Sequence, residues 1–363
     1  MKTLSFAAAA AAACAMAACA SAPDEAADTV TQADTWNPMN HPTRVRWDYE
    51  ADLYRLPLAR RTSKTPWSDD YWAFAKGGIA YRWQTGERPF SYRTGPSLEA
   101  LRTMSEADLA KLSPAEKYDV FVGAYDYPTV REMLTLTSPS AESWEGFCDG
   151  WANAAIHYAE PQPVTLEGAG GIRVPFASSD VKALLTYFQS RKAVIARTRL
   201  GEVCTGSFAA DPSLARTPAC EDTNAGGFHV TLANLIGLED TPFVGDITRD
   251  AQIWNQPFYA YDSRVERTQA PSPGAAPDAV KEAIVTTRLT YVVEVAPHQT
   301  PRHADVVVEY RYRLELDANE EIVGGSWISE ARPDFVWTNP KSEFSGAFAA
   351  LGTIYAAATG GAR

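Results

Sequence analysis

Three residues of this 363-residue chain have side chains suited to nucleophilic acyl transfer: Cys148, His229 and Asp246. Cys148 lies between Gly146 and Gly150, which would leave room for a substrate to approach the thiol. A helix that begins near Cys148 would stabilise a thiolate through its dipole, and its first amides could also donate to an oxyanion. The alternative is a buried cysteine without a chemical role.

His229 is the best candidate for the base among the five histidines of the chain. It follows the glycine pair Gly226 and Gly227 at the start of an apolar segment that we interpret as a strand. Asp246 follows at a distance that fits an adjacent antiparallel strand, and neighbouring strands lie about 4.8 Å apart. Its carboxylate would then orient the imidazole and stabilise the imidazolium. The alternative is a strand histidine and a turn aspartate that never meet.

Other residues near these positions are weaker candidates. His157 would lie about two and a half helical turns beyond the thiol and would therefore point away from it. Trp144, Trp151 and Trp254 could line the substrate site and exclude water, and the indole of Trp144 could donate to an oxyanion. Each tryptophan could equally pack in the core.

The N-terminus predicts export from the cytoplasm. Residues 1–22 have an early lysine followed by an apolar, alanine-rich run, which is typical of a signal peptide. An imperfect lipobox ending at Cys19 competes with an ordinary cleavage site just beyond it, so a lipid tether to the membrane through Cys19 is one of two alternatives. Residues 23–40 are polar and alanine-rich, which predicts a disordered tether. We therefore expect a periplasmic, cell-envelope or secreted protein.

Export also bears on the remaining cysteines. Cys204 and Cys220 bracket a short loop that contains glycine, proline and serine, a spacing that a disulfide closes readily. In an oxidising compartment we expect these two cysteines to be bridged. Cys148 is then left as the unpaired thiol.

The composition excludes some partners and indicates a fold class. A net charge of −12 argues against binding to nucleic acid or to anionic lipid, because both require clustered lysine and arginine. The 24 prolines and 23 glycines indicate a loop-rich α+β chain.

The predicted elements run from helices to strands. Helices are expected at residues 97–112, 113–122, 143–159 and 180–193, and strands at residues 228–235, 283–295, 306–316 and 322–329. This order predicts N-terminal helices packed on an antiparallel sheet. We expect one domain over residues 41–340 with a β-rich C-terminal half, followed by a C-terminal tail over residues 341–363.

Several short motifs resemble the transglutaminase elicitor family, known from oomycete cell walls and also present in bacteria. They are Leu112–Asp119, Trp144–Ala152 around the cysteine, Pro218–Cys220, Asn224–Asn234, Ile253–Pro257, Leu314–Asp317, Gly324–Trp327 and Pro333–Trp337. The resemblance covers about residue 100 to 340. It implies a papain-like cysteine acyltransferase core and protein-glutamine γ-glutamyltransferase activity. The family often has a histidine directly after the nucleophile, where this chain has Asp149.

The resemblance implies a function with two substrates. A protein or peptide glutamine would acylate Cys148, and a primary amine would then take the acyl group to form an isopeptide bond. No cofactor is predicted. Dependence on Ca²⁺ stays open, because some transglutaminases use this ion while the sequence has no calcium loop of the D-x-D-x-D-G type. One alternative is a papain-like protease or amidase that acts on cell-envelope peptides. Another is an envelope binding module with a vestigial site.

Overall fold

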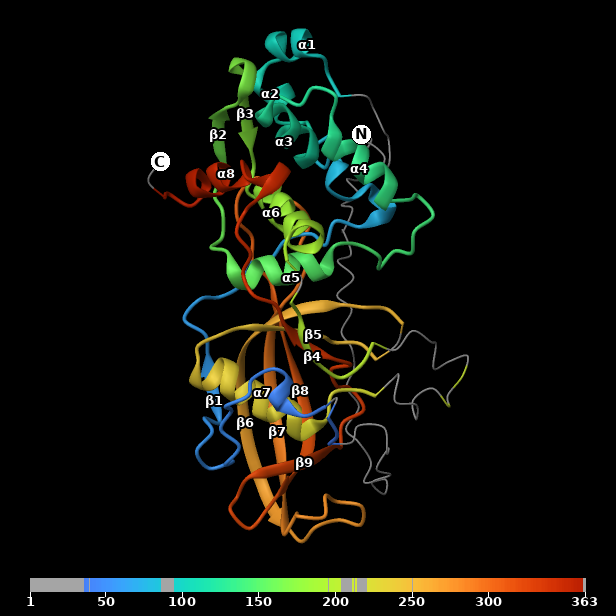
Figure 1. Ribbon diagram of the computed structural model, residues 1–363, viewed down its shortest axis with the longest axis vertical. Helices are drawn as coiled ribbons and strands as arrows, with labels where there is room; N and C mark the ends of the chain where they lie inside the picture. The colour runs from blue at the N-terminus through green and yellow to red at the C-terminus, as the bar shows by residue number, and fades with distance from the viewer. Residues whose placement is uncertain are drawn as a thin grey trace, which may run out of the picture. The chain divides into compact units, whose positions relative to one another are not determined.

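An antiparallel sheet forms the C-terminal half of the chain, as its alternating pattern predicts (Figure 1). This computed structural model describes residues 36–38, 40–85, 95–194, 196–203, 211, 213, 221–249 and 251–361. Within them the sheet has eight strands in the order β4-β10-β5-β6-β7-β8-β9, with β1 paired to β6. The strands are β1 (Ala59–Arg61), β4 (Thr198–Leu200), β5 (Phe243–Asp246), β6 (Asn255–Gln269), β7 (Lys281–Val292), β8 (Asp305–Leu316), β9 (Ile322–Trp327) and β10 (Val336–Thr338).

Helices surround a second core. They are α1 (Leu98–Thr103), α2 (Glu106–Leu109), α3 (Pro114–Val122), α4 (Pro128–Leu136), α5 (Cys148–His157), α6 (Ser178–Tyr187) and α8 (Leu351–Ala358). A further helix, α7 (Ala225–Leu232), packs on the sheet instead. Short 3-10 turns occur at Pro42–Arg44, Phe74–Lys76, Gly78–Ala80, Ala169–Gly171 and Gly346–Phe348. A hairpin of β2 (Val164–Glu167) and β3 (Arg173–Phe176) lies beside α3 and α8. Figure 1 shows α5 between these helices and the sheet, where it packs on β5 and β6.

Local sequence signals explain several helix boundaries. Ser113 caps α3 by accepting from the amide of Glu116, whose carboxylate accepts from the amide of Ser113 in return. This capping box confirms the predicted helix start. The helix expected from residue 143 begins instead at Cys148, so the thiol occupies its first position.

The strand predicted at residues 228–235 is wrong. This segment is α7, which continues as a π-helical turn over Ala233–Leu238. The side chain of Asn224 accepts from the amides of Gly226 and Gly227 and thereby caps the helix. Tertiary packing overrides the apolar, strand-like pattern, because every residue of α7 is buried, against β8 and β9 among others.

Both ends of the predicted domain extend further than expected. Asn40, the last residue of the predicted tether, is fully buried and hydrogen-bonds the backbone of Asp222 and Asn224. The predicted C-terminal tail contains α8, which buries Leu351 and Ile354 in the helical core. Among the described residues, no helix combines the length and the apolar character that crossing a membrane requires.

Candidate active site

Cys148 begins α5 because two glycines let backbones approach closely around it. A Cβ on Gly150 would lie 2.2 Å from the carbonyl oxygen of Thr186, and one on Gly146 would lie 2.7 Å from the carbonyl oxygen of Tyr71. The glycines therefore serve the close packing of α5 against neighbouring backbone. Phe147 precedes the thiol, is fully buried, and donates its amide to the carbonyl of Tyr71 at 2.7 Å.

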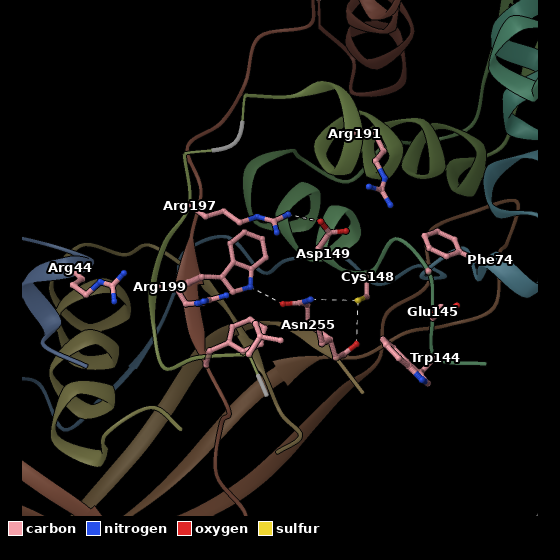
Figure 2. Close-up of a pocket in the computed structure, with 15 residues that line it drawn as sticks. Arg44, Phe74, Trp144, Glu145, Cys148, Asp149, Arg191, Arg197, Arg199 and Asn255 are labelled. Carbon is pink, nitrogen blue, oxygen red and sulfur yellow. Dashed lines mark hydrogen bonds and ion pairs between the residues drawn. The ribbon is translucent and has the colours of Figure 1, made fainter. Parts of the chain in front are cut away.

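Two groups from the segment that leads into β6 contact the thiol (Figure 2). The thiol of Cys148 donates to the carbonyl of Ile253, and the Nδ2 of Asn255 donates to Sγ, each at 3.5 Å. The indole Nε1 of Trp337 donates to Oδ1 of Asn255 at 2.7 Å. Because that oxygen accepts from the indole, the amide nitrogen of Asn255 points at the sulfur.

The surroundings keep the thiol protonated at neutral pH. Burial raises the pKa of Cys148 to about 12, and the neighbouring carboxylate of Asp149 acts in the same direction. The amide of Asn255 opposes them, since a donor to sulfur favours the thiolate. The carboxylate of Asp149 accepts from Ser190 and forms an ion pair with Arg197.

Cys148 lines a cavity of about 690 Å³ (Figure 2). Its walls combine aromatic and charged side chains from α5, from the strand ends and from the loops between them. The lining residues are Arg44, Phe74, Trp144, Glu145, Gly146, Cys148, Asp149, Arg191, Arg197, Arg199, Val203, Ile253, Asn255, Phe335 and Trp337.

His229 does not line this pocket. It lies on α7, not on the predicted strand, and it is fully buried. Its Nδ1 bonds the hydroxyl of Tyr312 on β8 at 2.7 Å, and that hydroxyl bonds Thr287 on β7. Burial lowers the pKa of His229 to about 4. These contacts fix the side chain within the packing of α7 on the sheet.

Asp246 organises the segment that reaches the thiol. It ends β5 opposite Asn255 on β6. Its Oδ1 accepts from the amides of Thr248 and Trp254 at 3.1 and 3.0 Å and from the hydroxyl of Thr248 at 2.9 Å. These bonds close the turn before β6, so Asp246 positions Ile253 and Asn255.

Among the described residues His229 makes no hydrogen bond to Cys148 or Asp246, so the structure does not show the predicted Cys-His-Asp triad. The thiol bonds the segment that Asp246 holds, while His229 bonds Tyr312. The physical reason is that α7 forms a helix and turns the imidazole into the sheet. His157, expected to point away, bonds the carbonyl of Asn339.

The three predicted tryptophans have different surroundings. Trp144 lines the pocket. Trp151 is fully buried in the helical core. Trp254 packs edge-on against Tyr71, with ring centroids 5.7 Å apart, and is not among the pocket residues.

Sequence reasoning missed Asn255, Trp337 and the pocket arginines as site residues. Two of these residues could have been selected from the sequence, because Asn255 and Trp337 belong to motifs that carry the family resemblance. Neither motif indicates by itself that its side chain reaches the thiol. Cys19 and the Cys204–Cys220 pair lie outside the described residues. Within the described ranges, no three His, Cys, Asp or Glu side chains are grouped to hold a metal.

The chain is similar to known transglutaminase proteins in sequence pattern and in fold. The family model named Transglutaminase elicitor matches residues 137–359. A similar solved structure is the GP42 transglutaminase from Phytophthora sojae, which is 20% identical with a TM-score of 0.65. The match covers 86% of this chain and 94% of that chain. At this identity the similarity concerns the fold. No curated protein matches the sequence.

Proposed function

Because the chain belongs to the transglutaminase elicitor family, we propose that it is a protein-glutamine γ-glutamyltransferase that forms a thioester on Cys148. The observation that supports this most strongly is the thiol at the first position of α5, in a cavity of about 690 Å³ and next to the amide of Asn255. A cysteine that begins a helix packed on an antiparallel sheet is also compatible with a papain-like core.

The proposed reaction has two acyl transfers. Sγ of Cys148 attacks the γ-carboxamide carbon of a glutamine, and the thiol proton passes to the amide nitrogen, which leaves as ammonia. A primary amine then attacks the thioester, its proton returns to sulfur, and an isopeptide bond forms. The first-turn amides of α5 and the Nδ2 of Asn255 are the donors that would stabilise the oxyanion. The chemistry uses no cofactor.

The resting thiol must be activated when the donor binds. A pKa of about 12 leaves little thiolate at neutral pH, so the substrate carboxamide has to displace the carbonyl of Ile253 as the partner of the thiol proton. The amide of Asn255 then stabilises the developing charge on sulfur. The proposal places this reaction outside the cytoplasm, on the basis of the predicted signal peptide.

Incorporation of a fluorescent primary amine into a glutamine peptide tests the proposal. The full-length protein should incorporate the amine, and Cys148→Ala should abolish incorporation without unfolding the chain. Thr135→Ala, on the exposed side of α4, is the control and should retain full activity. Full activity in Cys148→Ala would disprove the proposal. Peptide cleavage in place of amine incorporation would support the protease alternative.

A second candidate is a binding protein that uses this pocket without chemistry. The protonated thiol favours it, as does the lack of a histidine among the described residues that line the cavity. This candidate predicts that a glutamine peptide binds to the wild-type protein while neither amine incorporation nor ammonia release occurs.

A further inference from the structure

The pocket around Cys148 carries a charge opposite to that of the chain. Four arginines line it, Arg44, Arg191, Arg197 and Arg199, against the carboxylates of Glu145 and Asp149, whereas the whole chain has a net charge of −12. Figure 2 shows Arg197 and Arg199 on one side of Cys148 and Arg191 above the thiol, on the side of Phe74. An acidic protein thus presents a basic site at its candidate nucleophile.

Aromatic rings hold three of these guanidinium groups. Arg197 lies 4.6 Å from the ring centroid of Trp337, and Arg199 lies 5.5 Å from that of Phe335. Arg191 lies 5.6 Å from the ring centroid of Phe147. These ring contacts restrict the side chains, and a guanidinium held over a ring can still bind a carboxylate through its planar edge where that edge has no partner.

The arginines differ in the partners they already have. Arg197 pairs with Asp149, while Glu202 pairs with Arg199 at 2.6 Å and with Arg44 at 4.0 Å. Arg191 forms no ion pair with any of the described residues and has Phe147 as its ring partner. Its charge is therefore available to a ligand in the cavity.

We propose that the pocket selects an anionic acyl donor, a peptide in which carboxylate side chains flank the reacting glutamine, and that Arg191 is a specificity-determining residue. The inference rests on the proposed function only in placing the glutamine at Cys148; the preference for an anionic ligand is a property of binding. A cationic amine is repelled by the same charges, so the amine acceptor meets the thioester after the donor has neutralised the site.

Binding to the full-length Cys148→Ala variant tests the preference without any chemistry. The probes are three fluorescent peptides with one central glutamine, flanked by glutamates, by serines or by lysines. We expect the glutamate peptide to bind about tenfold more tightly than the serine peptide, and the lysine peptide to bind most weakly. The advantage of the glutamate peptide should shrink as salt is raised from 20 to about 500 mM.

Arginine variants assign the effect to the pocket. In the Cys148→Ala background, Arg191→Gln should weaken binding of the glutamate peptide about fivefold and leave the serine peptide unchanged. Arg191→Lys should retain part of the preference. Arg173→Gln, the same change at an exposed arginine on β3 outside the lining, is the matched control and should bind like its parent.

Alkylation of the wild-type thiol gives an independent readout. Iodoacetate and iodoacetamide differ in charge but little in size, so the ratio of their rates at Cys148 reports the local field. Arg191→Gln should lower this ratio about threefold and Arg173→Gln should not change it. Equal binding of the three peptides, or a ratio unaffected by Arg191→Gln, would overturn the inference. Binding with the predicted preference but without amine incorporation would contradict only the proposed function.

Discussion

The reactivity of Cys148 is set by three neighbours that lie far from it in the sequence. The carbonyl of Ile253 accepts a hydrogen bond from the thiol, and the side-chain amide of Asn255 donates one to the sulfur. The indole of Trp337 fixes the orientation of Asn255. The candidate nucleophile could be chosen from the sequence, because Cys148 stands between glycines and is the thiol left over if Cys204 and Cys220 are bridged. Its partners could not, since no local pattern brings together residues that tertiary packing alone makes neighbours.

The pH dependence of alkylation tests this local arrangement. Because the pKa of Cys148 is about 12, the rate of reaction with iodoacetamide should rise about tenfold per pH unit from pH 7 to 10. Asn255→Leu should slow the reaction several-fold at each of these pH values, since the thiolate loses its donor. Trp337→Phe should have a smaller effect in the same direction. A plateau of the wild-type rate near pH 8 would contradict the assigned environment.

At the scale of elements, the packing of α5 decides where the thiol lies. Gly150 faces the carbonyl of Thr186 and the side chain of Ser190, so α5 and α6 approach without an intervening side chain. The helix could be predicted from its sequence pattern. Its first residue could not, because the backbone contact between Phe147 and Tyr71 ends the preceding loop.

Alanine substitution of two helical glycines tests the close approach. Gly150→Ala should destabilise the fold by more than about 2 kcal/mol, since the added Cβ would lie 2.2 Å from a backbone oxygen. Gly352→Ala in α8 is the control, because its Cβ would have only an ordinary contact at 3.4 Å from Phe344. That change should stabilise the protein by up to about 1 kcal/mol. Urea unfolding measures both, and equal stabilities of the two variants would refute the packing argument.

The segment that contains His229 shows where the sequence pattern misleads. Its apolar residues fit a buried strand as well as a buried helix, and the two cannot be distinguished by periodicity. Asn224 is the cue that favours a helix, because its side chain caps the amides of the following glycine pair. The strand on which His229 was expected is therefore a helix, while its role as the base stays a prediction.

His229 should affect stability rather than the reactivity of the thiol. Its folded pKa of about 4 lies below the usual 6.5, so the unfolded chain binds the proton first as the pH falls. The neutral imidazole contributes stability above pH 6.5, and up to about 3 kcal/mol of it is lost between pH 6.5 and 4.

Urea unfolding of His229→Leu at pH 7 and at pH 4.5 measures this contribution. The variant should lose less stability than the wild type over this interval, and Tyr312 keeps Thr287 as its partner after the substitution. Iodoacetamide should alkylate Cys148 at the wild-type rate in the folded variant. A large fall in that rate with unchanged stability would instead support the assignment of His229 as the base.

For the whole molecule, helices in the first half and an antiparallel sheet in the second could be predicted, whereas α7, α8 and the assembly of the site could not. The alternating residues of β8 predicted a strand of an antiparallel sheet, and the capping box of α3 predicted a helix in the first half of the chain. The pocket draws on Arg44, on α5 and on residues up to Trp337, so it exists only after both halves have folded together.

Whether the predicted disulfide forms depends on the compartment in which the whole protein folds. We expect Cys204 and Cys220 to be bridged in protein purified from an oxidising compartment, leaving Cys148 as the free thiol of the mature chain. Peptide mapping without reductant, after alkylation of the denatured chain, should find the label on Cys148. A bridge between Cys148 and either of the other two cysteines would exclude a catalytic thiol.

The central claim is that Cys148 carries the acyl group, and intact mass spectrometry tests it most directly. The full-length protein is incubated with a glutamate-flanked glutamine peptide without amine and quenched in acid, which preserves a thioester. We predict a species heavier by the peptide less ammonia, located at Cys148, lost on addition of a primary amine and absent from Cys148→Ala. Amine incorporation without such a species, or the same adduct on Cys148→Ala, would contradict the account.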